Sequence, residues 1–302
     1  KASEYGYAFV EVYPVIKKRM GFVDLTFEIE EGKKIFIDRI DIIGNVKTVD
    51  KVIRRELELV DGDPFNSVKL RQSERNINNT ALFEGVEIKL DESSDSNKAT
   101  VEVEVKEKAT GQFSVGGGFS SLDGAIGNVS IRESNLFGEA KEISLALGIS
   151  TRKQEVDLSY TNPYFLDKDV AACIDLFNVR RNNKRYSGYK HNILGFRLRS
   201  GYEIINDLRH FSSYTLKRDK IHDISNTTSR FIQDQEGKRV TSIIGQAIQY
   251  SSLNDRINPT EGMRVRLDLD YYGLLGDAEH FQSELKVANF FRITDGIILG
   301  NF

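Results

Sequence analysis

Apolar and polar residues alternate strictly along most of the chain after residue 110. An aliphatic or aromatic residue occupies every second position in segments 142–149, 155–160, 194–199 and 264–271. A period of two places the apolar side chains on one face of a β-strand. Each segment approaches the roughly 9–11 residues that a tilted strand needs to cross a membrane. The pattern predicts strands near residues 112–119, 125–134, 140–151, 154–162, 168–178, 191–203, 209–218, 240–252, 262–273, 279–291 and 296–302.

The connections between these strands differ in length. Segment 151–153 is a short turn, whereas 219–239 is a longer polar connection. We expect long loops on one side of the sheet and short turns on the other, as is usual in outer-membrane barrels. A soluble sandwich or barrel would also alternate, but side chains cannot fill the interior of so large a barrel.

The pattern therefore favours a transmembrane β-barrel whose apolar face meets lipid. The face of each residue then follows from its position in the alternation. We expect lipid contact for Leu145, Leu147, Leu158, Leu267 and Leu269, and a lumen-facing position for Arg197, Arg199, Arg264, Arg266, Asp268 and Cys173.

The first 108 residues show mixed periodicities. Segments 9–12 and 23–29 alternate like strands, and the basic residues 17–19 are expected to form the turn between them. A third strand is predicted over 35–43, and Gly44-Asn45 ends it.

Two helices and two strands follow. Apolar residues at helical spacing predict a helix capped by Thr48, and a second helix over 66–79 carries Val68, Leu70 and Ile77 as its apolar positions. Strands are expected at 86–91 and 99–106. The order of strand, helix, helix, strand, strand predicts a small α+β domain. Its expected core is Ile40, Ile42, Val52, Ile53, Leu57, Leu82, Phe83, Val86, Val101 and Val103.

Composition narrows the class of protein. The 302 residues carry a formal charge of −3, without the concentrated positive charge that nucleic-acid binding needs. Gly is abundant (24 residues) and Pro is rare (4), which fits a curved sheet. The sequence contains no run of about 18 apolar residues, so no membrane-spanning helix is predicted. The opening Lys1-Ala2-Ser3-Glu4 has no apolar core of a signal peptide, so we expect Lys1 to begin a fragment.

Several motifs together resemble one family. Segment 35–106, with Gly44-Asn45 and the stretch 81–86, resembles a POTRA domain. Segment 110–119 resembles the first barrel strand of the BamA family of outer-membrane assembly proteins. The remaining matches, in the same order as in that family, are Asn135-Leu136-Phe137-Gly138, Tyr160-Thr161-Asn162-Pro163-Tyr164-Phe165 and Asn258-Pro259-Thr260-Glu261-Gly262.

The resemblance implies α+β POTRA domains followed by an antiparallel transmembrane β-barrel of 16 strands. The expected division is the C-terminal part of a POTRA domain over 1–31, a POTRA domain over 32–108, and the N-terminal part of the barrel over 109–302. About eleven of the family's 16 strands are expected here. The resemblance implies that the final strand and a late loop with the family's essential motif are absent from this sequence and would follow Phe302.

Two strand edges are the candidate sites for binding client proteins. Gly116, Gly117 and Gly118 interrupt the first barrel strand, without the following Lys-Ser/Thr of a phosphate loop. These glycines either weaken the strand at a place that must open or allow the sheet to curve. The lateral-gate candidates are Gln112, Phe113, Ser114, Val115, Gly116, Gly117, Gly118 and Phe119. The candidates at the POTRA edge are Val86, Glu87, Ile88, Lys89 and Leu90.

No catalytic residues, metal ligands or cofactor-binding residues are predicted. The four histidines, residues 191, 210, 222 and 280, lack metal-ligand spacing and are expected to face solvent or the lumen. The arginines of the inner register are expected either to face the hydrated lumen and pair with Asp268 or Asp270, or to contact the late loop; they are Arg197, Arg199, Arg264 and Arg266. Neither a nucleophile with a base nor a pair of catalytic carboxylates stands out.

The resemblance implies a protein that inserts β-barrel proteins into the outer membrane, with its POTRA domain in the periplasm. Its expected partners are unfolded outer-membrane proteins, membrane lipid and accessory lipoproteins of an assembly complex, and no nucleic acid. One alternative is a POTRA-containing pore that translocates polypeptides. Another is an outer-membrane enzyme or β-rich hydrolase, which the lack of a catalytic constellation disfavours.

Overall fold

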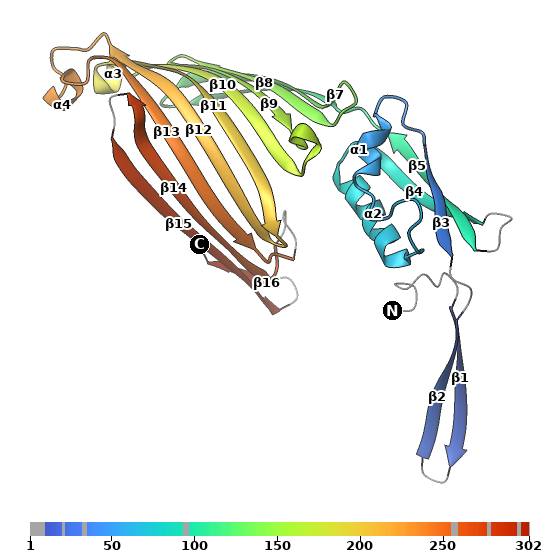
Figure 1. Ribbon diagram of the computed structural model, residues 1–302. Helices are drawn as coiled ribbons and strands as arrows, with labels where there is room; N and C mark the ends of the chain where they lie inside the picture. Colours follow the sequence, from blue (N-terminus) through green and yellow to red (C-terminus); the bar gives the residue numbers. More distant parts are fainter. Residues whose placement is uncertain are drawn as a thin grey trace. The chain divides into compact units, whose positions relative to one another are not determined.

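The chain forms two compact units. The computed structural model describes residues 10–19, 22–31, 35–92, 97–254, 259–276, 279–294 and 297–301 (Figure 1). One unit comprises Lys1–Thr110 with Asn135–Ala140, and the other comprises Gly111–Ser134 with Lys141–Phe302. No described helix is both long and apolar enough to span a membrane.

The second unit is one strongly curved sheet of eleven strands, each paired with its neighbour in the sequence (Figure 1). The pairs are antiparallel, as expected from the strand pattern. Because every predicted strand is present, the predicted barrel-like sheet is confirmed. The strands are β6 (Gly111–Ser120), β7 (Gly124–Leu136), β8 (Lys141–Ser150), β9 (Lys153–Asn162), β10 (Val170–Asn182), β11 (Lys190–Ile205), β12 (Leu208–His222), β13 (Gly237–Ser251), β14 (Gly262–Gly276), β15 (His280–Thr294) and β16 (Ile297–Asn301).

The register confirms the predicted faces of the sheet. Leu145 pairs with Leu158, and Leu158 pairs with Leu176, so apolar residues stand side by side across β8, β9 and β10. Leu267 likewise pairs with Ile248 and Leu285. Arg197, Arg266 and Asp268 occupy the alternate positions and share the opposite face. We call the apolar face outward and the polar face inner.

The predicted placement of long and short connections is wrong. We call the end of the sheet at which β6 begins proximal, and the end at which β6 ends distal. Consecutive antiparallel strands reverse direction, so the short connection 151–152 and the long connection 223–236 both lie at the distal end. The proximal end also has both kinds, a two-residue turn at 206–207 and a seven-residue connection at 163–169.

The α+β domain has the predicted order of elements. It consists of β3 (Phe36–Ile43), α1 (Asp50–Arg54), α2 (Ser67–Asn79), β4 (Phe83–Glu92) and β5 (Lys98–Glu107). The strands form one sheet in the order β3-β5-β4, with β3 parallel and β4 antiparallel to β5.

The core of this domain agrees with the expected residues. Seven of the ten are at most 5% exposed, and Ile42, Leu57 and Val86 are partly buried against them. Burial of such side chains stabilises a domain by roughly 1.5–3 kcal/mol each. Ile37, Leu59, Ile77 and Val105 complete this buried cluster. The fully buried members are Ile40, Val52, Ile53, Leu82, Phe83, Val101 and Val103.

Two details of the helices differ from the prediction. The N-cap of α1 is Val49, which makes no side-chain capping bond, and not the predicted Thr48. The buried Thr48 side chain accepts a hydrogen bond from Asn135 instead. Val68 is exposed at the start of α2, where Asn66 caps the helix by accepting from the amides of Val68 and Lys69.

The segment before this domain is a hairpin. Strands β1 (Val10–Arg19) and β2 (Phe22–Glu31) pair antiparallel over their whole length. Lys17, Lys18 and Arg19 therefore belong to β1 and not to the turn, a correction that follows from the pairing of Arg19 with Phe22. Residues 1–9, which include the predicted strand start at Phe9, lie outside the described residues.

The assignment of the outward face predicts a position-specific cost for a buried charge. Leu267→Arg should destabilise the folded barrel by about 2–4 kcal/mol if this position lies near the bilayer midplane. The matched control is Gln282→Arg, which places the same side chain on the inner face beside Asp270. Reversible unfolding in lipid vesicles measures both variants. Equal costs for the two would contradict the assignment of faces.

Candidate functional site

The small sheet presents one open edge. In the order β3-β5-β4, the strand β4 pairs with β5 on one side, and no other described strand pairs with its outer side. The predicted edge residues Val86–Leu90 lie in the middle of β4, where Glu87 and Lys89 are exposed. The sequence thus placed these five residues on an available edge strand.

The opposite edge of the same sheet is covered by the chain itself. The amide of Ile37 donates to the carbonyl of Asp63 at 2.9 Å, and the amide of Gly62 donates to the carbonyl of Ile37 at 2.7 Å. The amide of Phe65 donates to the carbonyl of Ile35, and the amide of Ile40 donates to the Asp61 carboxylate at 3.0 Å. The loop 61–65 therefore occupies outer backbone groups of residues 35–40, which include the first half of β3, where a fourth strand would otherwise pair.

The large sheet has its first strand at a margin. β6 pairs with β7, from Gly111 opposite Glu133 to Ser120 opposite Gly124, and it stands last in the strand order. Phe113, Val115 and Phe119 point to the outward face and are 67–84% exposed. The alternate positions of the predicted gate strand, Gln112, Ser114, Gly116 and Gly118, share the inner face.

Among the described residues, no neighbouring atom sterically requires glycine at positions 116, 117 or 118 of β6. None of Gly116, Gly117 and Gly118 has a positive φ. A Cβ atom would meet nothing within 4 Å at Gly116 or Gly118, and would make an ordinary 3.5 Å contact at Gly117. In contrast, a Cβ at Gly195 or Gly245 would overlap neighbouring atoms. The three glycines in β6 therefore reduce side-chain packing and rigidity where a larger residue would fit.

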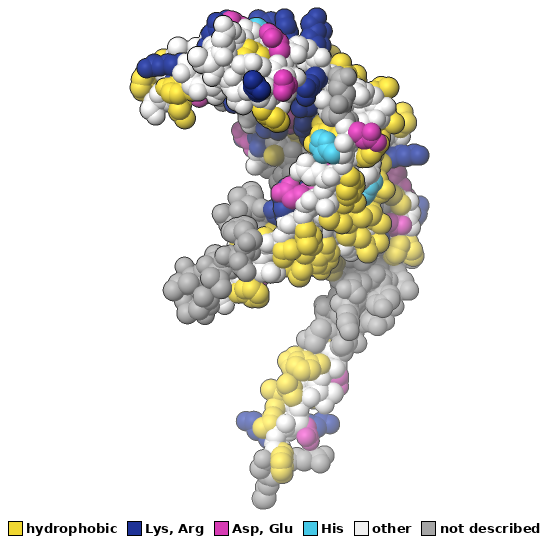
Figure 2. Space-filling model, turned by 90° about the vertical axis from the view of Figure 1, so that its left-hand side faces the viewer, with side chains coloured by type: hydrophobic (Ala, Val, Ile, Leu, Met, Phe, Trp, Pro, Cys, Tyr) yellow, Lys and Arg dark blue, Asp and Glu magenta, His cyan; other side chains and the backbone are white. Residues whose placement is uncertain are grey.

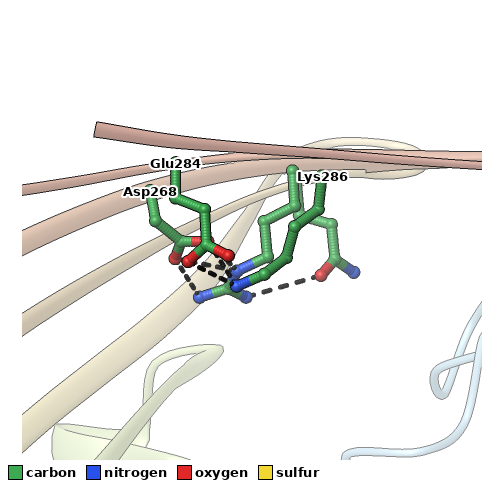
Figure 3. Close-up of polar contacts among 5 residues, drawn as sticks. Asp268, Glu284 and Lys286 are labelled. Carbon is green, nitrogen blue, oxygen red and sulfur yellow. Dashed lines mark hydrogen bonds and ion pairs between the residues drawn. The ribbon is translucent and has the colours of Figure 1, made fainter. Parts of the chain in front are cut away.

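The inner face carries a network of ion pairs. Arg266 donates to both carboxylate oxygens of Asp268 at 2.7–3.0 Å, and Lys286 contacts Glu284 at 2.9 Å and Asp268 at 3.6 Å (Figure 3). The side chains of Asp268, Glu284 and Lys286 point toward one another on this face. The predicted pairing of Arg266 with Asp268 is confirmed.

A second group lies on the inner face of β9, β10 and β11. Arg199 donates two hydrogen bonds to Asp175 at 2.7 and 2.8 Å, and Ser159 donates one more. Arg197 donates to Thr215 at 3.1 Å. Arg197, Arg199 and Thr215 border a hollow of about 550 Å³ on the inner face. The predicted contact of these arginines with a late loop stays a prediction.

The cysteine and the four histidines are divided between the inner and outward faces of the large sheet. Cys173 lies on the inner face as predicted, and its sulfur accepts from the Thr161 hydroxyl. His191 and His280 are also on the inner face, beside Asp219 and Tyr272. The register places His210 and His222 on the outward face, opposite Tyr202 and Lys190. Those two histidines therefore do not face the lumen, because they fall on the other phase of the alternation, and their exposure to solvent stays a prediction.

The turn Asn135–Ala140 is part of the α+β unit, which sequence reasoning missed. The Asn135 side chain accepts from the amide of Ala140 and donates to the Thr48 hydroxyl, each at 2.9 Å. The amide of Val49 donates to the carbonyl of Gly138, and Ala140 packs on the domain core. Gly138 has φ +76°, and a Cβ there would overlap the carbonyl of Lys47. The Asn-Leu-Phe-Gly motif at 135–138 is the sequence feature that could have indicated this contact. Its partner residues lie about 90 positions earlier in the sequence, so the motif alone did not identify them.

Glu107 at the end of β5 holds the same region together. Its carboxylate accepts from the amides of Lys47 and Thr48, at 2.6–3.1 Å. Partial burial tends to raise the pKa of Glu107, but hydrogen bonds from Thr48 and Lys47 outweigh it and lower the pKa. Glu107 therefore stabilises the domain as an anion.

Two family models match this chain. Residues 135–300 match the Omp85 superfamily domain, and residues 35–108 match the POTRA model, described as a surface antigen variable number repeat. The first match covers more than half of the 302 residues. The chain belongs to the Omp85 superfamily. This finding agrees with the resemblance in the sequence, with its POTRA domain and antiparallel barrel strands.

Curated relatives have consistent names. This Omp85 chain is 30% identical over 294 residues to the outer membrane protein assembly factor BamA of Neorickettsia risticii, covering 97% of the chain and 40% of that protein. It is 29% identical to BamA of Nitratidesulfovibrio vulgaris, covering 86% of the chain and 33% of that protein. The chain therefore spans well under half the length of these relatives. Their outer-membrane location agrees with the predicted location, a barrel in the outer membrane with its POTRA domain in the periplasm.

Solved structures support the fold. BamA from Haemophilus ducreyi lacking POTRA domains 1–3 matches with a TM-score of 0.78 at 20% identity, over 97% of this chain and 59% of that one. CdiB from Acinetobacter baumannii matches with a TM-score of 0.58 at 16% identity, over 96% and 55%. Among the described residues, no group of His, Cys, Asp and Glu has the arrangement of a metal site.

The lowered pKa of Glu107 predicts the pH dependence of the POTRA domain. A carboxyl group with a lower pKa in the folded state contributes stability that is present above its ordinary pKa of 4.5 and is lost as the pH falls through the folded value. Thermal unfolding of the domain, residues 35–110, should therefore weaken more steeply below pH 4.5 in the wild type than in Glu107→Gln. Parallel pH profiles of the two would contradict this role.

Proposed function

We propose that the complete protein assembles β-barrel proteins and inserts them into the outer membrane, by offering their strands a template at β6 and at the edge of β4. The observation that carries the proposal is the run Gly116–Gly118. It weakens a strand at the margin of the sheet without any steric need for glycine. The names of the curated relatives support the assembly role.

The physical problem is the unpaired backbone of the client. An unfolded barrel strand that enters lipid leaves amide and carbonyl groups without hydrogen bonds, at several kcal/mol for each group. An edge strand of the assembly protein supplies these partners by β-augmentation. Pairing at β6 must first be loosened, and a strand with three consecutive glycines opens at a smaller free-energy cost than a well-packed one.

The two edges have separate roles in this proposal. Residues Gln112–Phe119 form the lateral gate in the membrane, and Val86–Leu90 hold extended clients in the periplasm. The capped edge of β3 leaves β4 as the available template in the POTRA sheet. The process is noncovalent, without a cofactor or catalytic residue, and the folding of the client into lipid drives it.

The proposed partners are unfolded outer-membrane proteins, outer-membrane lipid and accessory lipoproteins of an assembly complex. The runner-up function, a polypeptide-translocating pore, would use the same domains with a conducting lumen. The assembly role is preferred because it gives the weakened margin strand a purpose, whereas translocation through the lumen requires no opening of the barrel wall.

The gate hypothesis predicts that restraining β6 slows assembly. Cysteines that lock residue 112 to the last strand of the complete protein should abolish client insertion, and reduction of the disulfide should restore it. Replacing Gly116, Gly117 and Gly118 together with Ala should slow insertion and stabilise the strand by roughly 0.5–1 kcal/mol for each position. The control Gly127→Ala adds a methyl group in β7, a strand with partners on both sides. Normal insertion by the locked protein would refute the gate.

The POTRA edge makes a second prediction. A photo-crosslinking residue in place of Lys89 on β4 should capture an extended peptide from a client barrel. The same probe in place of Arg39, exposed on the capped edge strand β3, should capture much less. Mass spectrometry of the crosslinked products gives the comparison. Equal capture at the two positions would show that binding does not depend on the open edge.

A further inference from the structure

The outward face of the large sheet carries a row of basic residues near its distal end. Cross-strand pairing connects Arg180 to Asn192, Asn192 to Lys220, and Lys220 to Lys238. Arg180 and Lys238 are exposed, and Lys220 is half-buried. Arg218 lies on the same face, two residues before Lys220. We call Arg180, Lys220 and Lys238 the outward basic row.

The positive charge of this row is not neutralised within the described part of the protein. None of its three side chains has a carboxylate within 4 Å among the described residues, whereas neighbouring bases do: Lys217 pairs with Asp219 at 3.2 Å and Lys190 with Asp223 at 2.8 Å. Lys220 and Lys238 lie directly opposite each other, an arrangement that destabilises a strand pair when both are charged. A bound anion would relieve this repulsion.

The row lies at a boundary of the apolar surface. The next outward row toward the proximal end is mixed and carries Asn178, Leu194, Arg218 and Val240, and the row after it is mostly apolar, with Leu176, Phe196 and Leu216 beside Ser242. Ten residues further along β10, Val170 is in the row of Tyr202 and His210, which contains no Lys or Arg. That interval is roughly 33 Å along a strand, or about 25 Å across the membrane at the usual tilt.

This separation is comparable to the usual height of a barrel's apolar band, and the outward positions change from apolar to basic toward its distal limit, so we infer that the basic row lies at the level of lipid headgroups. Figure 2 shows Lys and Arg side chains gathered at the upper end of the large sheet, where the distal α3 (Lys184–Ser187) and α4 (Arg230–Gln233) lie in Figure 1. Long basic side chains at such a boundary extend their charged groups to the headgroups while their stems remain on apolar surface.

We propose that Arg180, Lys220 and Lys238 bind the phosphate of an anionic lipid headgroup in the membrane leaflet at the distal end. Arg180 offers a planar set of donors that suits phosphate oxygens, and the two lysines offer ammonium groups one strand apart. Asn192 stands between Arg180 and Lys220 in the row and adds an uncharged donor. This lipid site is separate from the client-binding edges and does not depend on their proposed role.

Lipid retention by the purified full-length protein tests the proposal. Native mass spectrometry measures the copies retained of phosphatidic acid and of diacylglycerol with the same acyl chains. Wild type should retain phosphatidic acid preferentially. The combined variant R180Q/K220Q/K238Q should lose at least about fivefold in retention, the effect expected for removing even one basic residue at an anionic surface.

A matched variant removes the same charge from the inner face. R181Q/K217Q/R239Q alters residues on β10, β12 and β13, one to three positions away, and should keep phosphatidic acid within about twofold of wild type. The charge-preserving variant R180K/K220R/K238R should also retain it. Resistance of the folded barrel to unfolding in SDS confirms that each variant folds. If the triple Gln variant does not fold, the single variant K238Q should still show a fall of about fivefold.

Three results would overturn the proposal. Equal retention of phosphatidic acid and diacylglycerol by wild type would show that phosphate is not recognised. Equal losses in the outward and inner Gln variants would indicate a general charge effect. Displacement of phosphatidic acid by inorganic phosphate would indicate a site for the free anion. None of these outcomes bears on client insertion, so the assembly function is tested independently.

Discussion

Continuous backbone pairing from β6 to β16 is the constraint on which the large sheet depends. In lipid, every amide and carbonyl must have a partner, and the neighbouring strand is the only available source. Pairing fixes the register, and the register decides which side chains meet lipid. The outward position of Leu267 and the inner position of Arg266 are therefore two results of one arrangement. The ion pairs of the inner face follow, because the charged side chains are brought together there.

Periodicity in the sequence was sufficient to locate all eleven strands and the faces of their leucines, because alternation is local information. The order of the POTRA elements and most of its core were predictable for the same reason. Contacts between distant segments were not. The role of Thr48 depends on Asn135, and the covering of β3 depends on the loop 61–65. Neither partnership has a local signal in the chain.

The candidate edges illustrate the same division. The sequence identified Gly116–Gly118 and favoured weak pairing only slightly over curvature as the reason for these glycines. In the structure the backbone at these three positions is ordinary, and added methyl groups would not collide with any described residue, so no described neighbour requires glycine there. For Val86–Leu90, the sequence predicted a strand at a sheet edge. That the outer side of this strand is unpaired follows from the order of the sheet, in which β5 is central and β4 is at the side.

The covering of β3 also limits self-association. A sheet with two free edges can recruit copies at both and grow without end, which is the route to fibrous aggregates. Here the loop 61–65 occupies one side through backbone hydrogen bonds. Two copies that met through β4 would have only their covered β3 sides facing outward, so growth would stop at a pair. The domain can thus present one open edge strand, at which we propose that clients bind, without forming a nucleus for its own polymerisation.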